Sequence, residues 1–135
     1  MSFIVKDTGF TSDDWKGGFA TAEERPNEAR GLDLPSDADV TELGPLLDQV
    51  EMIRVDFPSF ADGRGFTIAR RLRLMGFTGR LRAKGHVIAD QYAMARRSGF
   101  DEVEIDDALA ARQPEDQWLA RANWQQHDYQ ARLRG

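Results

Sequence analysis

Residues 62–65, Asp-Gly-Arg-Gly, combine side chains and backbone suited to holding a small anion. They follow one predicted strand and open a predicted helix, where free backbone N–H groups attract negative charge. The guanidinium of Arg64 would add a fixed fork of donors, and Gly63 and Gly65 would permit positive φ and a close backbone approach. The alternative is structural, with Asp62 capping the helix and pairing with Arg64. The spacing matches no nucleotide-binding motif.

A second group of basic residues lies at the end of another predicted strand, at Arg82, Lys84 and His86. In a parallel sheet the carboxyl ends of neighbouring strands meet at one edge, where ligands bind. These side chains would then surround one small dianion together with Arg64. No catalytic residue is assigned. The predicted site for an anion or a partner consists of Asp62, Gly63, Arg64, Gly65, Arg82, Lys84 and His86.

Three polar residues would support this site, namely Asp56, Asp90 and Gln91. Asp90 would orient Arg64 or Arg82, unless it belongs to an exposed first helical turn that the helix dipole favours. Asp56 belongs to a charged face that the predicted strands share. That face is either a polar binding surface or a cross-strand ionic ladder exposed to solvent.

The composition excludes several kinds of chemistry. The chain has no cysteine, which excludes disulfides, thiolate metal sites, cysteine-bound iron–sulfur clusters and a cysteine nucleophile. With only two histidines, far apart in the sequence, we expect no metal site. There is no dinucleotide-binding fingerprint, so no cofactor is assigned.

Charge is segregated along the chain. Residues 52–100 carry ten Lys and Arg against three Asp and Glu, a net charge of +7, although the whole chain carries −5. The basic middle indicates either neutralisation inside the fold or a site for an anion or an acidic partner. Nucleic acid is not an expected partner, because the field of the whole protein would repel phosphates.

A repeating strand–helix pattern begins near residue 30. The strands alternate apolar and charged residues, and the helices carry apolar residues on one face. We predict strands at residues 31–34, 52–57, 80–84 and 101–105, and helices at residues 36–50, 65–75, 87–98 and from 114 onward.

This pattern predicts an α/β fold. Strands separated by helices pair in parallel, and one charged face per strand puts every helix on the other side. We therefore expect a four-stranded parallel βα repeat in sequential order, like half of a barrel. The alternative is a small flavodoxin-like three-layer sandwich. Residues 1–29 would form an N-terminal arm, with Trp15 and Phe19 packed on a single domain of residues 30–135.

The chain has no apolar run long enough to span a membrane and no secretory signal, so we expect a cytoplasmic protein without a membrane partner. A sheet with one open polar face leaves both a monomer and a homo-oligomer open.

Several short motifs between Val55 and Ile105 carry a family resemblance. They are Asp62-Gly63-Arg64, Leu81-Arg82-Ala83 with Gly85, Asp90-Gln91 and Gly99-Phe100-Asp101. The pattern resembles the bacterial family called domain of unknown function 934. The resemblance implies a role in sulfite reduction, sulfur assimilation and cysteine biosynthesis. Members are described as oxidoreductases of that process and tend to be encoded beside assimilatory sulfite reductase.

Three functions follow as hypotheses. The first is an accessory protein of assimilatory sulfite reduction that binds a small oxyanion or an acidic partner such as sulfite reductase. The second is an oxidoreductase of that pathway that uses a flavin or a nicotinamide. The third is a small phosphate-binding enzyme in which Arg64 and Arg82 clamp the substrate and Asp62 or Asp90 acts as the base.

Overall fold

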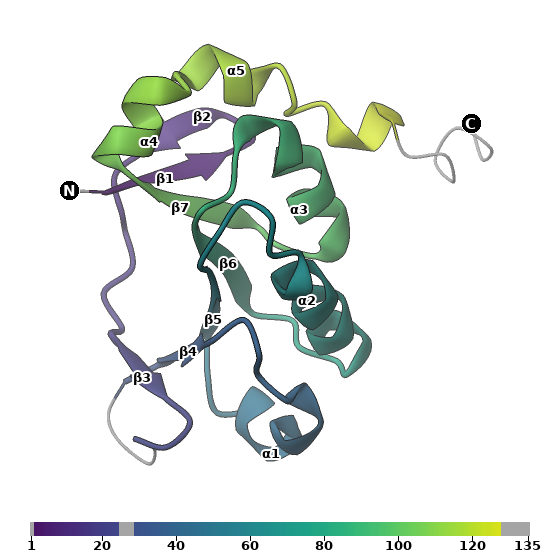
Figure 1. Cartoon of the computed structure of the whole chain (residues 1–135). Helices are drawn as coiled ribbons and strands as arrows, with labels where there is room; N and C mark the ends of the chain where they lie inside the picture. The colour runs from purple at the N-terminus through teal and green to yellow at the C-terminus, as the bar shows by residue number, and fades with distance from the viewer. Residues whose placement is uncertain (1, 25–28, 128–135) are drawn as a thin grey trace.

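The computed structural model describes residues 2–24 and 29–127 and contains one seven-stranded sheet (Figure 1). The strands are β1 (Ser2–Lys6), β2 (Gly9–Thr11), β3 (Phe19–Thr21), β4 (Gly31–Leu34), β5 (Met52–Phe57), β6 (Arg80–Gly85) and β7 (Glu102–Asp106). Their order across the sheet is β2-β1-β7-β6-β5-β4-β3. Strands β3 to β7 are parallel to one another, and β1 pairs antiparallel with both β2 and β7.

The four predicted strands form the centre of this sheet, in sequential order. Their alternation sets the register, since Ile53 lies opposite Leu81 and Val55 opposite Ala83 on the apolar face. All four of these side chains have no exposed surface. The α/β class is confirmed. The predicted sheet had four strands, whereas the observed sheet has seven, because the segment before residue 30 contributes three more.

The helices are short apart from α2. They are α1 (Gly44–Leu47), α2 (Arg64–Leu74), α3 (Tyr92–Ser98), α4 (Asp107–Arg112) and α5 (Glu115–Leu119), with 3₁₀ turns at Val40–Glu42, Ala89–Gln91 and Trp124–His127. The predicted helix at residues 36–50 is replaced by a 3₁₀ turn and α1. Pro45 lies in the first turn of α1, where its missing N–H prevents one continuous helix. Each helix of the described residues is too short or too polar to cross a lipid bilayer.

Helices α1, α2 and α3 cover one face of the sheet (Figure 1). Phe66, Ala69 and Leu72 of α2 are buried against it. In α5, Trp118 is buried edge-on against the ring of Tyr92. This packing buries one continuous apolar core that includes residues of every strand from β4 to β7.

The opposite face of the sheet carries the charged residues and is covered by an extended segment. Residues 12–18 connect β2 to β3 on the side away from α2 and α3 (Figure 1). Trp15 packs on Phe19, and Phe19 lies over the guanidinium of Arg54. Among the described residues no helix covers this face, so the arrangement is not a three-layer sandwich. The face was expected to be open to solvent, and that expectation was wrong, because Arg82, Glu102 and Glu104 are buried there.

The N-terminal segment also supplies strands to both sides of the parallel centre. Strand β1 pairs with β7 at one side, and β3 pairs with β4 at the other. The segment predicted as an arm on the domain therefore lies in the same sheet as residues 31–106.

Candidate functional site

Asp62 and Arg64 form an ion pair at the start of α2. The Arg64 guanidinium donates to both carboxylate oxygens, at 3.0 and 2.7 Å, and also to the hydroxyl of Ser36. The same carboxylate accepts the Arg64 backbone N–H at 3.1 Å. These hydrogen bonds hold the pKa of Asp62 well below its usual range. The geometry agrees with the ion pair of the structural alternative, although the N-cap residue of α2 is Gly63 and Asp62 accepts the N–H of the first helical residue, Arg64.

The two glycines of this segment do not adopt the left-handed conformations that were expected. Gly63 has φ of −89°, and the described glycines with positive φ are elsewhere in the chain. Gly65 serves close packing, since a Cβ there would come within 2.4 Å of the Phe57 ring. The small size of Gly65 thus lets α2 pack closely on a side chain of β5, which is a different role from the predicted approach of its backbone to an anion.

Arg82 lies in the middle of a buried ionic cluster. Its Nε donates to Glu102 at 2.7 Å, and its Nη1 donates to Glu104 at 2.8 Å. The carboxylate of Asp13 adds two more acceptors. Burial alone would lower the pKa of Arg82, but these carboxylates outweigh it and raise the pKa. A guanidinium with no exposed surface and three carboxylate partners is not available to an external anion.

The neighbouring charges continue this cluster across the strands. Arg54 makes a bidentate pair with Asp33 and donates to Glu104. Arg80 bridges Glu102 and Asp14. The charged strand face is thus a cross-strand ionic network, as the structural alternative proposed, although it lies beneath residues 12–18.

Lys84 and His86 remain accessible at the carboxyl end of β6. Together with Arg112 they line a pocket of about 180 Å³, which we call the Lys84 pocket. All three basic residues are exposed. Lys84 and Arg112 have no hydrogen bond or ion pair to any other described residue. The two acids that also line the pocket are already engaged, Glu104 by Arg82 and Arg54, and Asp106 by the N–H of Leu109.

The turn after β6 positions these side chains. Gly85 has φ of +110°, which residues with a side chain rarely adopt. The next residue, His86, donates its backbone N–H to the Phe57 carbonyl at 2.9 Å. The His86 ring Nδ1 lies 3.2 Å from the same oxygen, and the ring lies edge-on to Phe60. With a proton on Nδ1 directed at the Phe57 carbonyl, Nε2 of the neutral ring would be an acceptor, so Lys84 and Arg112 are the donors that the pocket offers to an anion.

The chain matches one family model over residues 31–135, and that family consists of bacterial proteins of unknown function, DUF934. The protein belongs to the DUF934 family. A search of curated proteins and a search of solved structures each gave no match.

The motifs that this DUF934 chain shares with the family pattern are largely structural here. Asp101 accepts the backbone N–H of Leu81 at 2.9 Å and the guanidinium of Arg73 at 3.0 Å. Gly99 ends α3 with φ of +117°. The side chain of Gln91 accepts from the Ile88 N–H and donates to the Phe60 carbonyl, which fixes the loop beside His86.

Two of the predicted supporting residues lie apart from Arg64 and Arg82. Asp90 pairs with Arg121 at 2.8 Å, rather than orienting Arg64 or Arg82. Asp56 is exposed and lies opposite Lys84 in the sheet register. The predicted anion site of the DUF934 chain is therefore divided. Arg64 is paired at the surface, Arg82 is buried, and Lys84 and His86 line one pocket with a residue that was not predicted from the sequence.

That missed residue is Arg112, at the end of α4. The last helix was predicted to begin at Pro114, so Arg112 lay outside every predicted element. The signal that would have located it is the strand-end rule, because α4 directly follows β7 and β7 is parallel to β6. Among the described residues, no group of three or more His, Asp or Glu side chains is arranged to hold a metal ion.

Proposed function

We propose that this DUF934 protein is an accessory protein of assimilatory sulfite reduction, in the route to cysteine. It binds a small oxyanion such as sulfite, or an acidic group of sulfite reductase, at the Lys84 pocket. The observation that carries the proposal is the convergence of Lys84, His86 and Arg112 on one pocket. The resemblance to the DUF934 family supplies the metabolic context.

The charge balance of the pocket supports anion binding. Lys84 and Arg112 make no hydrogen bond to another described residue, and Glu104 is paired with Arg82 and Arg54, so two cations face the single exposed carboxylate of Asp106. An ammonium and a guanidinium together match the charge and the acceptor oxygens of a dianion.

The size of the pocket favours an inorganic oxyanion or a single carboxylate over an organic cofactor. Sites for drug-sized ligands have volumes of about 300–1,000 Å³. The Lys84 pocket, at about 180 Å³, is smaller than that range. This comparison favours a small oxyanion over a flavin or a nicotinamide as the ligand of the Lys84 pocket.

Calorimetric titration with sulfite, sulfate and phosphate at low salt tests the proposal directly. We expect saturable binding of at least one of these anions, weakened about five- to tenfold by Lys84→Gln or by Arg112→Gln. Arg70→Gln is the matched control, since it removes an exposed charge on α2 outside the pocket. Equal weakening by the control would indicate attraction to the whole surface only.

Affinity capture with the cognate sulfite reductase tests the protein partner. We expect a salt-sensitive complex that Lys84→Gln weakens, because contacts between surface charges are screened by salt. The proposal fails if no anion binds and no complex with sulfite reductase forms.

A further inference from the structure

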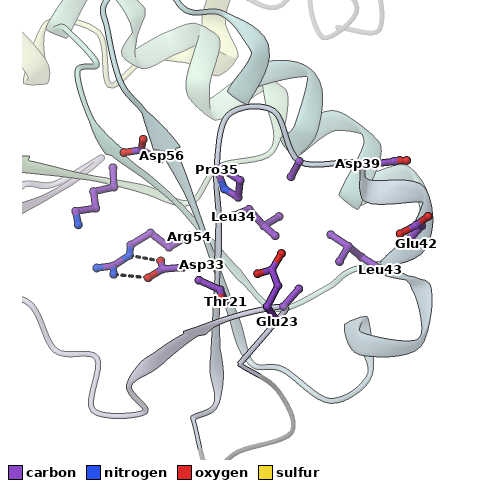
Figure 2. A pocket seen from close by; sticks show the side chains of 13 residues that line it. Thr21, Glu23, Asp33, Leu34, Pro35, Asp39, Glu42, Leu43, Arg54 and Asp56 are labelled. Atoms are coloured by element: carbon purple, nitrogen blue, oxygen red, sulfur yellow. Dashed lines mark hydrogen bonds and ion pairs between the residues drawn. The ribbon is translucent and has the colours of Figure 1, made fainter.

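A second and larger cavity, of about 540 Å³, lies at the carboxyl ends of β3, β4, β5 and β6. Figure 2 shows Asp33, Arg54 and Asp56 at one side of it, and Asp39, Glu42 and Leu43 at the other. Leu34 and Pro35 lie between them. Its volume is within the usual range for small-molecule sites. It plays no part in the proposed function, although Lys84 borders both cavities.

The cavity has an apolar wall. Ala22, Leu34, Pro35, Ala38 and Leu43 line it, and Leu34 and Leu43 also belong to the hydrophobic core. Because these two side chains are fixed by the core, the wall is preformed. A ligand with a compact hydrocarbon part would gain by covering it.

The basic residues at the cavity offer little to an anion. Arg54 is committed to Asp33, at 2.6 and 2.8 Å, and also donates to Glu104. The ring of Phe19 lies over this guanidinium, with its centroid 3.7 Å from the central carbon. Lys84 lies opposite Asp56 in the register of β5 and β6. No ion pair joins Lys84 to Asp56, but the two basic side chains of the cavity are outnumbered by its five acidic ones, which are Glu23, Asp33, Asp39, Glu42 and Asp56.

The remaining carboxylates give the cavity an excess of negative charge. Glu23 and Glu42 line it, are exposed, and have no hydrogen bond or ion pair to another described residue. Asp39 accepts hydrogen bonds from the backbone and side chain of Thr41, which lower its pKa, and its carboxylate forms no ion pair with a described residue. An amine would meet an apolar wall and uncompensated carboxylates, whereas an anion would be repelled.

We propose that this cavity binds a small organic cation, namely an amine with a compact hydrocarbon part. The hydrocarbon part covers Pro35 and Ala38, beside the buried Leu34 and Leu43, and the ammonium group lies toward Glu23 and Glu42. The proposed ligand differs in sign of charge from the ligand of the Lys84 pocket, so the two sites are distinguishable by titration.

Titration with three matched probes tests the inference, using backbone amide resonances as the signal. The probes are cyclohexylamine, cyclohexanol and cyclohexanecarboxylate at physiological ionic strength. We expect cyclohexylamine to shift the amide resonances of Leu34 and Leu43 in a saturable manner. We expect cyclohexanol to bind more weakly, and cyclohexanecarboxylate to leave these resonances unchanged. Tighter binding of the carboxylate than of the amine would overturn the inference, and so would no response to any probe.

Substitutions of carboxylates test which of them bind the ammonium group. Glu23→Gln combined with Glu42→Gln should weaken cyclohexylamine binding about fivefold. Asp48→Asn, which removes an exposed carboxylate outside the cavity, should leave the binding unchanged. Equal weakening in both proteins would mean that the amine senses only the net charge of the surface and would also overturn the inference. Arg112→Gln, which is directed at the Lys84 pocket, should leave amine binding intact, so failure of one site is separable from failure of the other.

Discussion

The carboxylate of Asp13 accepts hydrogen bonds from both terminal nitrogens of Arg82, each at 3.0 Å. The two residues are 69 positions apart in the sequence. Their contact attaches the segment after β2 to the middle of β6, where Arg82 has no exposed surface. A predicted binding cation is thus part of the framework of the fold.

Asp13→Ala should lower the free energy of unfolding by about 1–2 kcal/mol, because a charged hydrogen-bonded partner of a buried guanidinium is lost. Asp14→Ala is the matched control at the next position. Its carboxylate pairs with Arg80 but is 62% exposed, so its loss should cost at most about 0.5 kcal/mol. Urea unfolding measures both. An equal decrease in the free energy of unfolding for both variants would mean that the Asp13–Arg82 contact stabilises the fold no more than an exposed ion pair does.

Arg82→Met should lower the free energy of unfolding by about 3–5 kcal/mol, since it leaves the carboxylates of Glu102 and Glu104 buried without their main partner. Arg64→Met should change it by at most about 0.5 kcal/mol, because that side chain is 60% exposed. Thermal and urea unfolding distinguish the two. A well-folded Arg82→Met protein of normal stability would contradict a structural role for the cluster.

Acid should destabilise the protein through Asp7, which lies in the turn between β1 and β2. Burial alone raises the pKa of Asp7, but hydrogen bonds from Tyr92, Trp124 and Arg96 outweigh it and lower the pKa below 3.8. A lowered folded-state pKa contributes stability above the unfolded value, and this contribution is lost as the pH falls through the folded value. Asp7→Asn should therefore be less stable than the wild type at neutral pH.

The same difference should shrink as the pH falls below about 4. Urea unfolding curves at a series of pH values measure it. A difference in stability that stays constant down to about pH 2.5 would show that the charge of Asp7 is not the stabilising feature.

Gly65→Ala should destabilise the protein by about 1–3 kcal/mol, although alanine favours helix formation. The added Cβ would lie within 2.4 Å of the Phe57 ring, which is buried. Gly44→Ala is the control, because a Cβ there meets nothing within 4 Å. It should leave stability unchanged or raise it. Thermal unfolding of both variants compares them, and a harmless Gly65→Ala would mean that α2 can move away from β5.

The proposed role in sulfite reduction predicts a growth phenotype. A strain without the gene should fail on sulfate and on sulfite, and sulfide should restore its growth. A plasmid copy with Lys84→Gln and Arg112→Gln should fail to complement, whereas a copy with Arg70→Gln should complement. Normal growth of the deletion strain on sulfite would contradict the proposed step.

The centre of the fold was predictable because its signals are local. Alternating apolar and charged residues in β5, β6 and β7 determined strand positions and faces. The strands β2 and β3 have three residues each, and three residues are too few to show an alternation of apolar and polar side chains. The site was predicted less well for a related reason. The sequence indicates that Arg82 is charged, but its partner Asp13 can be identified only from the fold, which brings two distant segments into contact.

Lys84 and His86 were located correctly at a strand end because that inference needs only the parallel order of the strands. Their partnership with Arg112 needed the exact start of α4. That start depends on the hydrogen bond from the Leu109 N–H to the side chain of Asp106. Helix boundaries depend on single capping contacts of this kind, and they are the least certain part of any such prediction.

The placement of β1 and β3 on either side of the β4–β7 centre has a consequence for shortened forms of the protein. The family match begins at residue 31, yet β4 and β7 each form one of their ladders with a strand that precedes this point. A fragment starting there would leave two rows of backbone amides and carbonyls without partners. Exposed strand edges of this kind form hydrogen bonds with other chains, so the fragment should self-associate into β-rich aggregates.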